Sequence, residues 1–400
     1  MGKEMSRRQF LGFAGGTLAI VAGLGLAGCS GDGSDGGSNS GSEKLKVAVV
    51  CDSAGKNDGG YNQQAIEAAQ KIADEKGWEL KVVEPTNGIP QALESLGEDG
   101  YKLVFSMEYD FEALINGTGG ADPIASQYPD TTWVIFNDNP NKAEDGSAKH
   151  KNVISVLFNL NESSFIAGAL SVLVNENSQT LFGSDGYNFT APDAGGRAMG
   201  FIGGTNSNGI TVFSYGYIQG INYEAQKLGV KYDYYAKYDA GFTDSAAGST
   251  VAGTYYGNGA NIVFGCAGNV GDGITSKAKE VGKLAIQVDA NKDDQQPGYV
   301  LTSVLKSTDV PVNDVCKALV DDKLAELGNV VNFPLSTGAT DITDLSVISQ
   351  HVTEGGKQKW DEIKAEIESL RGKVGTDIKI VNAQAGEEFD PASCPNVTIK

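Results

Sequence analysis

The stretch LKVAVVCDSAGKNDGGYNQQAIEAAQKIADEKG, residues 45–77, decides the fold. Its first seven residues are mostly apolar and predict a buried strand, and a glycine-containing turn from Gly55 to Gly60 follows. Residues 62–77 then carry alanine and isoleucine at helical spacing, which predicts a helix. A strand, a glycine turn and a helix in this order form the repeating unit of a parallel α/β sheet.

The same unit recurs along the chain on both sides of a polar break at residues 137–151. Before the break, strands are expected at 79–84, 102–106 and 132–136 and a helix at 89–96. After it, strands are expected at 152–158, 199–204, 232–238, 262–265 and 283–288, and helices at 163–174 and 212–228. The sequence therefore predicts an α/β protein of two similar lobes with parallel sheets. Residues 182–197 and the tail from 376 are interpreted as loop additions.

The amino-terminal residues predict export and lipid attachment. Residues 6–11, SRRQFL, resemble a bacterial twin-arginine signal, and residues 26–29, LAGC, resemble a lipobox with Cys29 as the lipidated residue. Residues 1–28 are thus expected to be a signal peptide. A single transmembrane anchor is the alternative, because about 18 apolar residues are near the lower limit for a span. Residues 29–43 are rich in Gly, Ser and Asp and predict a flexible tether to the extracytoplasmic face of the cell membrane.

Composition excludes several classes of function. The formal net charge is −20, and a field of that sign repels nucleic acid. Only two histidines occur, His150 and His351, and no G-x-S-x-G, P-loop or H-E-x-x-H motif is present in the folded part. The segment from Asp289 to Asp293 matches the start of a calcium loop but lacks the glycine and glutamate that such a loop needs. We therefore expect no catalytic group, no metal and no cofactor.

Four cysteines lie beyond Cys29 and form no C-x-x-C pair, which argues against a zinc site. They are Cys51, Cys266, Cys316 and Cys394. Export permits a disulfide, and Cys316 with Cys394 is the pair to test. Four inert thiols are the alternative.

Residues 52–63, DSAGKNDGGYNQ, follow the carboxyl end of the first strand, where open α/β sheets bind ligands. This segment resembles the D-x-x-G-x-x-D-x-x-F-N-Q opening of the basic membrane protein family, which comprises substrate-binding lipoproteins related to the purine nucleoside receptor of spirochetes. Further segments keep the order of that family, at 152–158, 164–168, 200–204, 213–220, 267–273, 288–289 and 301–306. The resemblance spans nearly the whole chain after the tether.

The resemblance implies a type I periplasmic-binding-protein fold, with two Rossmann-like lobes joined by a three-strand hinge. We expect residues 44–158 and 290–332 to form the amino-terminal lobe, and residues 159–289 and 333–400 the carboxy-terminal lobe. The family implies a substrate-binding component of an ABC importer, which delivers a nucleoside to a membrane permease with a cytoplasmic ATPase. Such a protein catalyses nothing, and we expect it to be a monomer.

The resemblance also places the ligand-binding residues. The family's base-stacking aromatic falls on Tyr61 and its opposite partner on Phe213, and a base stacked in this way gains about 1–3 kcal/mol. The family's polar contacts fall on Asp58 and Asn62 near the base, on Gly268, Asp289 and Lys306 around the ribose, and, in a looser alignment, on Asp110. Carboxylates accept hydrogen bonds from ribose hydroxyls and purine N–H groups, and a lysine donates to a hydroxyl, so the residue types suit a nucleoside.

Departures from the family pattern leave other functions open. The family's Asp-Lys-Ser-Phe becomes DGGY at residues 58–61, and a tyrosine suits an isoalloxazine ring as well as a purine. Riboflavin or a sugar on the same scaffold is therefore an alternative ligand. A secreted nucleosidase or glycosidase using Asp58, Asp289 or Glu108 is an alternative activity, and a sensor or adhesin without a permease is a further one.

Overall fold

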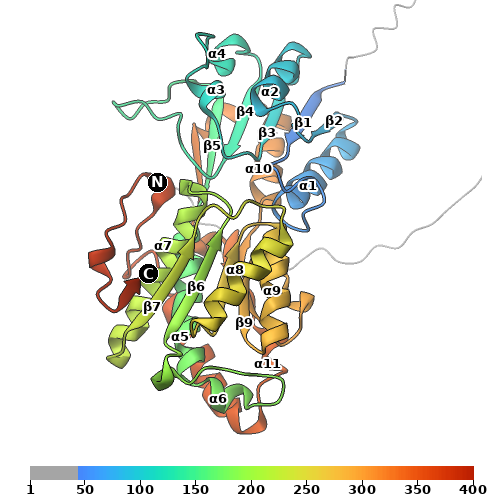
Figure 1. The fold of residues 1–400 in the computed structure, drawn as a ribbon. Coiled ribbons are helices and arrows are strands. Elements are labelled where there is room, and N and C mark those ends of the chain that lie inside the picture. The colour runs from blue at the N-terminus through green and yellow to red at the C-terminus, as the bar shows by residue number, and fades with distance from the viewer. Residues whose placement is uncertain (1–43) are drawn as a thin grey trace, which may run out of the picture. The chain divides into compact units, whose positions relative to one another are not determined.

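The computed structural model describes residues 44–400. The predicted signal peptide, lipidation site Cys29 and tether 29–43 lie outside the described residues. The described chain contains two sheets, each covered by helices (Figure 1). No helix in this part of the chain is both long enough and apolar enough to cross a membrane.

The first sheet has the strand order β11-β5-β4-β3-β1-β2, and all its neighbouring strands are parallel. Its strands are β1 (Lys46–Val50), β2 (Glu79–Val83), β3 (Leu103–Ser106), β4 (Thr132–Phe136), β5 (Val153–Phe158) and β11 (Val330–Phe333). Its helices are α1 (Tyr61–Lys76), α2 (Ile89–Glu98), α3 (Glu112–Ile115), α4 (Ile124–Gln127) and α10 (Asp309–Val320).

The second sheet has the order β12-β10-β9-β8-β6-β7-β13 and is parallel except for the pair β10–β12. Its strands are β6 (Ala198–Gly203), β7 (Tyr232–Lys237), β8 (Ile262–Cys266), β9 (Leu284–Asp289), β10 (Val300–Lys306), β12 (Thr340–Ile342) and β13 (Val397–Ile399). The helices of this lobe are α5 (Leu160–Glu176), α6 (Ser178–Phe182), α7 (Asn208–Leu228), α8 (Ser245–Gly257), α9 (Asn269–Val281), α11 (Ser346–Ser349) and α12 (Lys357–Arg371).

Strand periodicity explains why helices cover both faces of each sheet. Successive side chains of a strand point to opposite faces, and in β6 both sets are apolar. Phe201 packs in the core formed with α5 and α7, whereas Ile202 packs in the core formed with α8 and α9. The sheet therefore has to be buried on both sides, and the fold is the predicted α/β arrangement with parallel-dominated sheets.

The chain passes between the two sheets three times, from β5 to α5, from β10 to α10 and from β11 to β12. The expected assignment of residues 290–332 to the amino-terminal lobe is wrong for β10. This strand pairs in parallel with β9, with Val304 opposite Val288, and its residues are almost all buried in the second sheet. The crossing occurs only after Lys306, and α10 then packs on α1. The topology divides the chain into an amino-terminal lobe of residues 44–158 and 307–333 and a carboxy-terminal lobe of residues 159–306 and 334–400.

The carboxy-terminal tail is more than a loop addition. Its last strand, β13, pairs in parallel with β7 at the edge of the second sheet. A short 3-10 helix, η7 (Ala383–Ala385), lies in the same tail near the first crossing, where the Gln384 Oε1 atom accepts a hydrogen bond from the Phe158 backbone N–H at 3.1 Å. The tail therefore contacts both the second sheet and the connection between the lobes.

The four cysteines in the described part of the chain are buried free thiols. Cys51, Cys266, Cys316 and Cys394 form no disulfide there, so the candidate disulfide between Cys316 and Cys394 is not present. Burial raises the pKa of the Cys51 and Cys316 thiols to about 12. Both thiols are therefore protonated and unreactive near neutral pH.

Candidate functional site

Six of the eight predicted ligand-binding residues lie around one small cavity between the lobes. This inner cavity is enclosed by Asp58, Tyr61, Phe213, Gly268, Asp289 and Lys306, together with Asp52, Tyr109, Phe242 and Cys266 among others. Most of these residues follow the carboxyl ends of strands, where a parallel sheet presents its ligand site. The cavity measures ≈ 20 Å³, whereas ligand sites for small molecules usually measure about 300 Å³ or more.

Asp58 lies at the start of α1, and its carboxylate is taken up by the protein itself. One oxygen accepts hydrogen bonds from the Gly60 and Gln63 backbone N–H groups, at 3.1 and 3.0 Å. The other accepts from the Asn62 backbone N–H at 2.8 Å and from the Asn62 side-chain amide at 3.2 Å. The backbone N–H groups at the start of a helix have no partner within the helix. Asp58 accepts from three of them and therefore caps α1.

Asn62 does not line the inner cavity. Its side chain is fully buried, and its Nδ2 donates to Asp52 Oδ1 at 2.6 Å and to the Gly55 carbonyl at 3.1 Å. Its Oδ1 accepts from the Asp52 backbone N–H at 3.1 Å. Asn62 therefore fixes the loop after β1 against α1, and its side chain, predicted to contact a base, is not among those that line the inner cavity.

Asp52 is a cavity residue that the predicted set of ligand contacts omits. It directly follows Cys51 after β1, it is 4 % exposed, and burial raises the pKa of its carboxyl to about 6. Its hydrogen bonds from the Asn62 amide and the Ala54 N–H partly oppose that rise. A single oxygen, Oδ1, receives both bonds, which leaves Oδ2 as an acceptor beside the cavity.

Lys306 and Asp289 supply opposite charges to the inner cavity. Lys306 is 1 % exposed, and its ammonium lies 4.2 Å from the centroid of the Tyr61 ring. Within residues 44–400 this ammonium has neither a carboxylate within salt-bridge distance nor a hydrogen-bond acceptor, and the Asp289 carboxylate makes no hydrogen bond either. Burial lowers the pKa of Lys306 and raises that of Asp289, and each charge partly offsets the shift of the other. Asp289 is only partly buried, but the Lys306 ammonium is costly in the protein alone, because a buried charged group needs a partner.

The backbone at Asp289 is strained. Its φ is +73°, in the left-handed region that a non-glycine residue seldom adopts. Strained residues of this kind cluster at ligand sites and active sites. Asp289, the last residue of β9, lines the inner cavity.

Gly268 is required by close packing across the cleft. It has φ +50° and precedes α9, and a Cβ atom at this position would lie 3.1 Å from the Phe242 carbonyl oxygen and 3.3 Å from the Ala54 Cβ. Phe242 belongs to the carboxy-terminal lobe and Ala54 to the amino-terminal lobe. The glycine therefore allows the two lobes to approach each other at the site.

Aromatic rings form much of the cavity wall. The Tyr61 hydroxyl accepts a hydrogen bond from the Asn137 amide at 2.7 Å, which fixes the ring. Phe213 is 1 % exposed and packs edge-on against Phe264 at 6.1 Å. The Lys306 ammonium lies near both predicted base-stacking rings, at 4.2 Å from Tyr61 and 5.9 Å from Phe213.

Asp110 borders a second, outer cavity. This outer cavity measures ≈ 320 Å³ and is lined by Asp52, Ser53, Glu108, Tyr109, Asp110, Thr205, Asn206, Ser207 and Phe242. Asp110 is exposed and its carboxylate accepts from the Glu112 N–H at 3.1 Å. Burial, with the nearby charge of Asp52, raises the pKa of Glu108 to about 7. The predicted residue Asp110 is therefore near the site but not among the residues that enclose the inner cavity.

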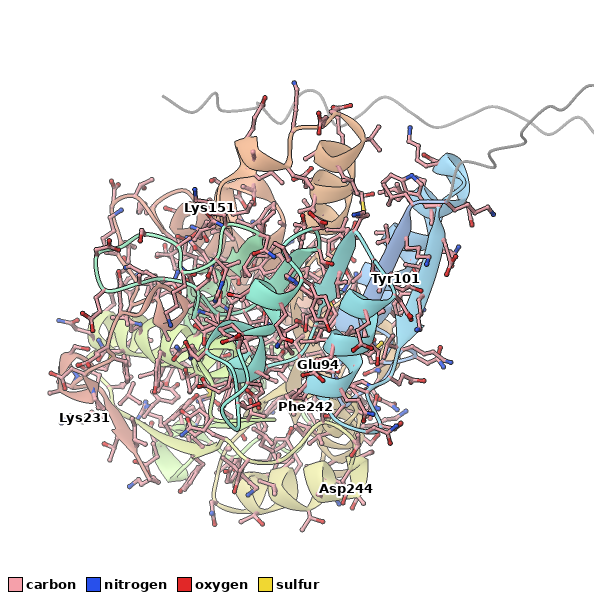
Figure 2. All side chains as sticks on the ribbon, turned by 90° about the horizontal axis from the view of Figure 1, so that it is seen from above. Glu94, Tyr101, Lys151, Lys231, Phe242 and Asp244 are labelled. Atoms are coloured by element: carbon pink, nitrogen blue, oxygen red, sulfur yellow. The ribbon has the colours of Figure 1, made fainter. Side chains whose placement is uncertain are left out.

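Tyr109 and Phe242 are the aromatic residues that the sequence prediction missed. Their rings stack at a centroid distance of 5.5 Å with an interplanar angle of 13°. Viewed from above, Phe242 lies toward the middle of the molecule, whereas Asp244 of the same connection lies at its edge (Figure 2). Both rings follow the carboxyl ends of strands, β3 and β7, and this position is the signal that could have identified them.

No group of three or more His, Cys, Asp or Glu side chains in residues 44–400 is arranged to hold a metal ion. The site as described offers stacking surfaces, one buried ammonium and several carboxylates. In chemical terms, such groups can pair with an uncharged ligand that has a planar ring and hydroxyl or N–H groups.

Comparisons with known proteins identify relatives over most of the chain. A relative from Lactococcus lactis subsp. cremoris, named ABC transporter nucleoside-binding protein BmpA, is 28% identical over 374 residues, which cover 88% of this chain and 96% of that protein. A protein of Pyrococcus furiosus named as an uncharacterized lipoprotein is 28% identical over 358 residues, covering 86% of this chain and 81% of the other.

Solved structures support the fold. An ABC transporter solute-binding protein from Aeropyrum pernix K1 superposes with a TM-score of 0.67 and 22% identity, over 84% of this chain and 93% of that one. This likeness shows that the two lobes have the type I periplasmic-binding-protein arrangement.

The family is shown by a match to most of the chain. Residues 44–372 match the Bmp family, which is described as ABC transporter substrate-binding protein PnrA-like. That range contains the amino-terminal lobe, most of the carboxy-terminal lobe and every residue of the inner cavity. The chain therefore belongs to the Bmp family of PnrA-like ABC transporter substrate-binding proteins.

Proposed function

We propose that this protein binds a purine nucleoside in the cleft between its lobes and delivers it to an ABC permease with a cytoplasmic ATPase. Lipid on Cys29 would hold it at the extracytoplasmic face of the cell membrane, with residues 29–43 as the tether, and it acts as a monomer. It performs no chemistry on the ligand. Ligand binding favours the closed arrangement of the lobes to the extent that the ligand binds this arrangement more tightly than the open one.

One observation carries this proposal, namely the buried Lys306 ammonium beside Asp289. Neither side chain is satisfied by the described protein, yet both lie at the inner cavity. A ribose offers two adjacent hydroxyl groups, of which one can accept from the ammonium while both donate to the carboxylate. A ligand with this diol would supply the missing partners and offset the cost of burying the Lys306 ammonium.

The aromatic wall favours a nucleoside over a simple sugar. Tyr61 is fixed by Asn137, and Tyr61, Tyr109, Phe213 and Phe242 all line the inner cavity. Stacking on such rings is worth about 1–3 kcal/mol per base. The relative from L. lactis is named a nucleoside-binding protein, which agrees with this choice.

Riboflavin and sugars remain the competing ligands, and hydrolysis of a nucleoside is the competing activity. Asp58 is a poor candidate for a catalytic carboxylate, because its oxygens already accept from the Gly60, Asn62 and Gln63 backbone N–H groups and from the Asn62 side-chain amide. A general acid or nucleophile needs a carboxylate that can reach the substrate.

The test is the thermal unfolding of residues 30–400 with adenosine, guanosine, inosine, cytidine, riboflavin or ribose at millimolar concentration. A ligand at 100 times its Kd adds about 2.7 kcal/mol and raises the midpoint by a few degrees. We expect a shift with purine nucleosides, and no shift with riboflavin or ribose. A shift with riboflavin alone would replace the proposed ligand, and release of free base from inosine would replace the proposed activity.

A matched variant separates the ribose contact from general effects. Asp289→Asn keeps the size of the side chain and is expected to lower nucleoside affinity by about tenfold or more, since it removes a charged hydrogen-bond acceptor. Asp272→Asn changes a carboxylate in the first turn of α9 that does not line the inner cavity, and is expected to bind as the wild type does. Equal affinities for all three proteins would contradict the assignment of Asp289 to the ribose.

A further inference from the structure

Tyr109 links aromatic rings from both lobes. It follows β3 in the amino-terminal lobe, and its ring stacks on Phe242, which follows β7 in the carboxy-terminal lobe, at 5.5 Å and 13°. On its own lobe the same ring lies 6.1 Å from the Tyr61 ring, tilted by 31°. These separations fall within the range of attractive aromatic pairs, about 4.5–7 Å. Tyr109 thus makes the kind of contacts that a planar ligand would make in the cleft.

The Tyr109 ring also separates the two cavities. Tyr109 and Phe242 line both the inner cavity of ≈ 20 Å³ and the outer cavity of ≈ 320 Å³. The inner cavity contains the free Lys306 ammonium but has too little room for a nucleoside, while the outer cavity has room but lacks that ammonium. A ligand that reaches Lys306 therefore has to take space that the Tyr109 ring now fills, or part the lobes and break its stack.

The ring is held by packing alone. Tyr109 is partly buried, whereas Tyr61, Tyr217 and Tyr256 are buried. The hydroxyls of these three are hydrogen-bonded, Tyr61 to Asn137, Tyr217 to Ser171 and Tyr256 to the Leu284 carbonyl. The Tyr109 hydroxyl bonds to no residue within 44–400. Moving this ring costs its stacking contacts but leaves no polar group without a partner, so it is easier to displace than its neighbours.

A glycine of the carboxy-terminal lobe leaves room for the Tyr109 ring. At Gly209, at the start of α7, a Cβ atom would lie 2.9 Å from Tyr109 Cε1 and 2.7 Å from Asn137 Cβ. Gly209 has no positive φ, so the backbone conformation does not require glycine there. The need for a small residue comes from the approach of Tyr109 and Asn137 across the cleft.

We propose that Tyr109 is an internal competitor of the ligand, whose ring occupies the stacking position on Phe242 that the planar part of the ligand takes on binding. This proposal rests on the proposed function, because it needs a ligand with an aromatic ring. It adds that Phe242 is a stacking partner in the site, and that the protein lowers its own affinity by filling the site with a side chain.

The competition has a measurable size. Only molecules with the Tyr109 ring displaced are competent to bind, so the apparent Kd equals the intrinsic Kd divided by the competent fraction. A single aromatic pair is worth about 0.5–1.5 kcal/mol, which corresponds to about a 2- to 12-fold reduction of that fraction. Removing the ring is therefore expected to raise the association rate constant by about 2- to 12-fold and to lower the apparent Kd.

Stopped-flow fluorescence with adenosine, or with the purine nucleoside that gives the largest thermal shift, tests this. We expect Tyr109→Ala to associate faster than the wild type, and Tyr109→Phe, which keeps the ring, to associate more slowly than Tyr109→Ala. Tyr187→Ala is the matched control, because Tyr187 stacks on Phe189 at 5.4 Å and 10° outside both cavities. It is expected to associate at the wild-type rate.

Two results would overturn the proposal. An unchanged association rate in Tyr109→Ala would show that the ring does not compete. Weaker binding in Tyr109→Ala through faster dissociation would show that the ring contacts the bound ligand. Neither result touches the proposed function, whereas the absence of any nucleoside binding by the wild type would remove that function first.

Discussion

Two buried lysines have opposite roles because their surroundings differ. Lys283 is 4 % exposed, and its ammonium donates to Thr190 Oγ1, the Ala260 carbonyl and Asn261 Oδ1 at 2.8–3.0 Å. Lys306 is 1 % exposed and donates to no described residue. A fully bonded ammonium maintains structure, whereas an unbonded one in a cavity is available to a ligand.

Replacing each lysine with methionine separates these roles. Lys306→Met is expected to lower nucleoside affinity by about 10- to 100-fold, the value of a hydrogen bond from a charged group, and to leave the free energy of unfolding unchanged or higher. Lys283→Met is expected to lower the free energy of unfolding by about 1–3 kcal/mol, since it removes three hydrogen bonds from a charged donor, and to leave affinity unchanged. Urea unfolding and titration calorimetry measure both. A loss of stability in Lys306→Met, with affinity retained, would contradict the assignment.

Asp52 makes stability depend on pH. Burial raises the pKa of its carboxyl from 3.8 to about 6, so the native state holds this proton to higher pH than the unfolded chain. The contribution of Asp52 to the free energy of unfolding therefore falls as pH rises from about 4 to 6 and stays low above that, by about 2–3 kcal/mol. Asp52→Asn keeps an amide oxygen for the Ala54 and Asn62 donors but cannot titrate.

The expected result is that Asp52→Asn gains stability over the wild type as pH rises from 4 to 7. Urea unfolding at several pH values measures the difference. Asp74→Asn, which changes an exposed acid on α1, is expected to follow the wild type throughout. A constant difference between Asp52→Asn and the wild type across this range would show that the pKa of Asp52 is not raised.

At the scale of residues, the predicted ligand contacts were chosen because they follow strands or match the family pattern. Of these, Tyr61, Asp289 and Lys306 line the inner cavity. Asn62 does not line it, because its amide donates to Asp52 and Gly55, and its sequence position cannot reveal this. Tyr109 and Phe242 were not predicted, although both follow the carboxyl ends of strands, because their stack forms between the lobes and no local pattern shows that contact.

At the scale of elements, the helix pair α5–α7 depends on glycine at its contact. A Cβ atom on Gly220 would lie 2.0 Å from the Phe165 carbonyl oxygen, and one on Gly168 would lie 2.3 Å from the Tyr217 carbonyl oxygen. Backbone atoms cannot move aside as a flexible side chain can. The close approach of the two helices therefore requires glycine at these positions.

Gly220→Ala is accordingly expected to lower the free energy of unfolding by about 1–3 kcal/mol or more, because the helices have to separate. Gly253→Ala on α8 is the matched control, since its Cβ would meet Lys277 Cδ no closer than 3.7 Å. That control is expected to gain up to about 1 kcal/mol from the better helix propensity of alanine. Guanidinium unfolding gives both values, and equal stabilities would contradict the role of the close contact.

The elements that the sequence predicted are those with strong periodicity. The strand β4 was placed at its observed bounds, and α1 within one residue of them. The lobe assignment of β10 failed because its apolar pattern fits either sheet, and only its pairing with β9 decides. The strand β13 escaped prediction because its three residues are too short to show a period, and it forms only because β7 offers an unpaired edge.

At the scale of the whole molecule, the carboxy-terminal tail contacts the connection between the lobes. Gln384 is 2 % exposed, and its Oε1 accepts from the Phe158 N–H, where β5 leads into the first crossing. Nearby, the Asn161 amide of α5 donates to the Ile380 carbonyl at 2.9 Å, and the Gln219 Oε1 of α7 accepts from the Val381 N–H at 3.2 Å. The tail thus fixes the start of α5 against α7 beside the connection between the lobes.

We expect the contact of Gln384 with the β5–α5 connection to restrain bending between the lobes. Gln384→Ala is expected to lower the free energy of unfolding by about 1–3 kcal/mol, because the buried Phe158 N–H loses its acceptor. It is also expected to increase the radius of gyration of the protein without ligand, measured by small-angle X-ray scattering, while saturating nucleoside restores the wild-type value. Glu388→Ala changes an exposed residue of the same tail and serves as the control. If Gln384→Ala destabilises the protein but keeps the wild-type radius of gyration without ligand, the tail stabilises the fold without restraining the hinge.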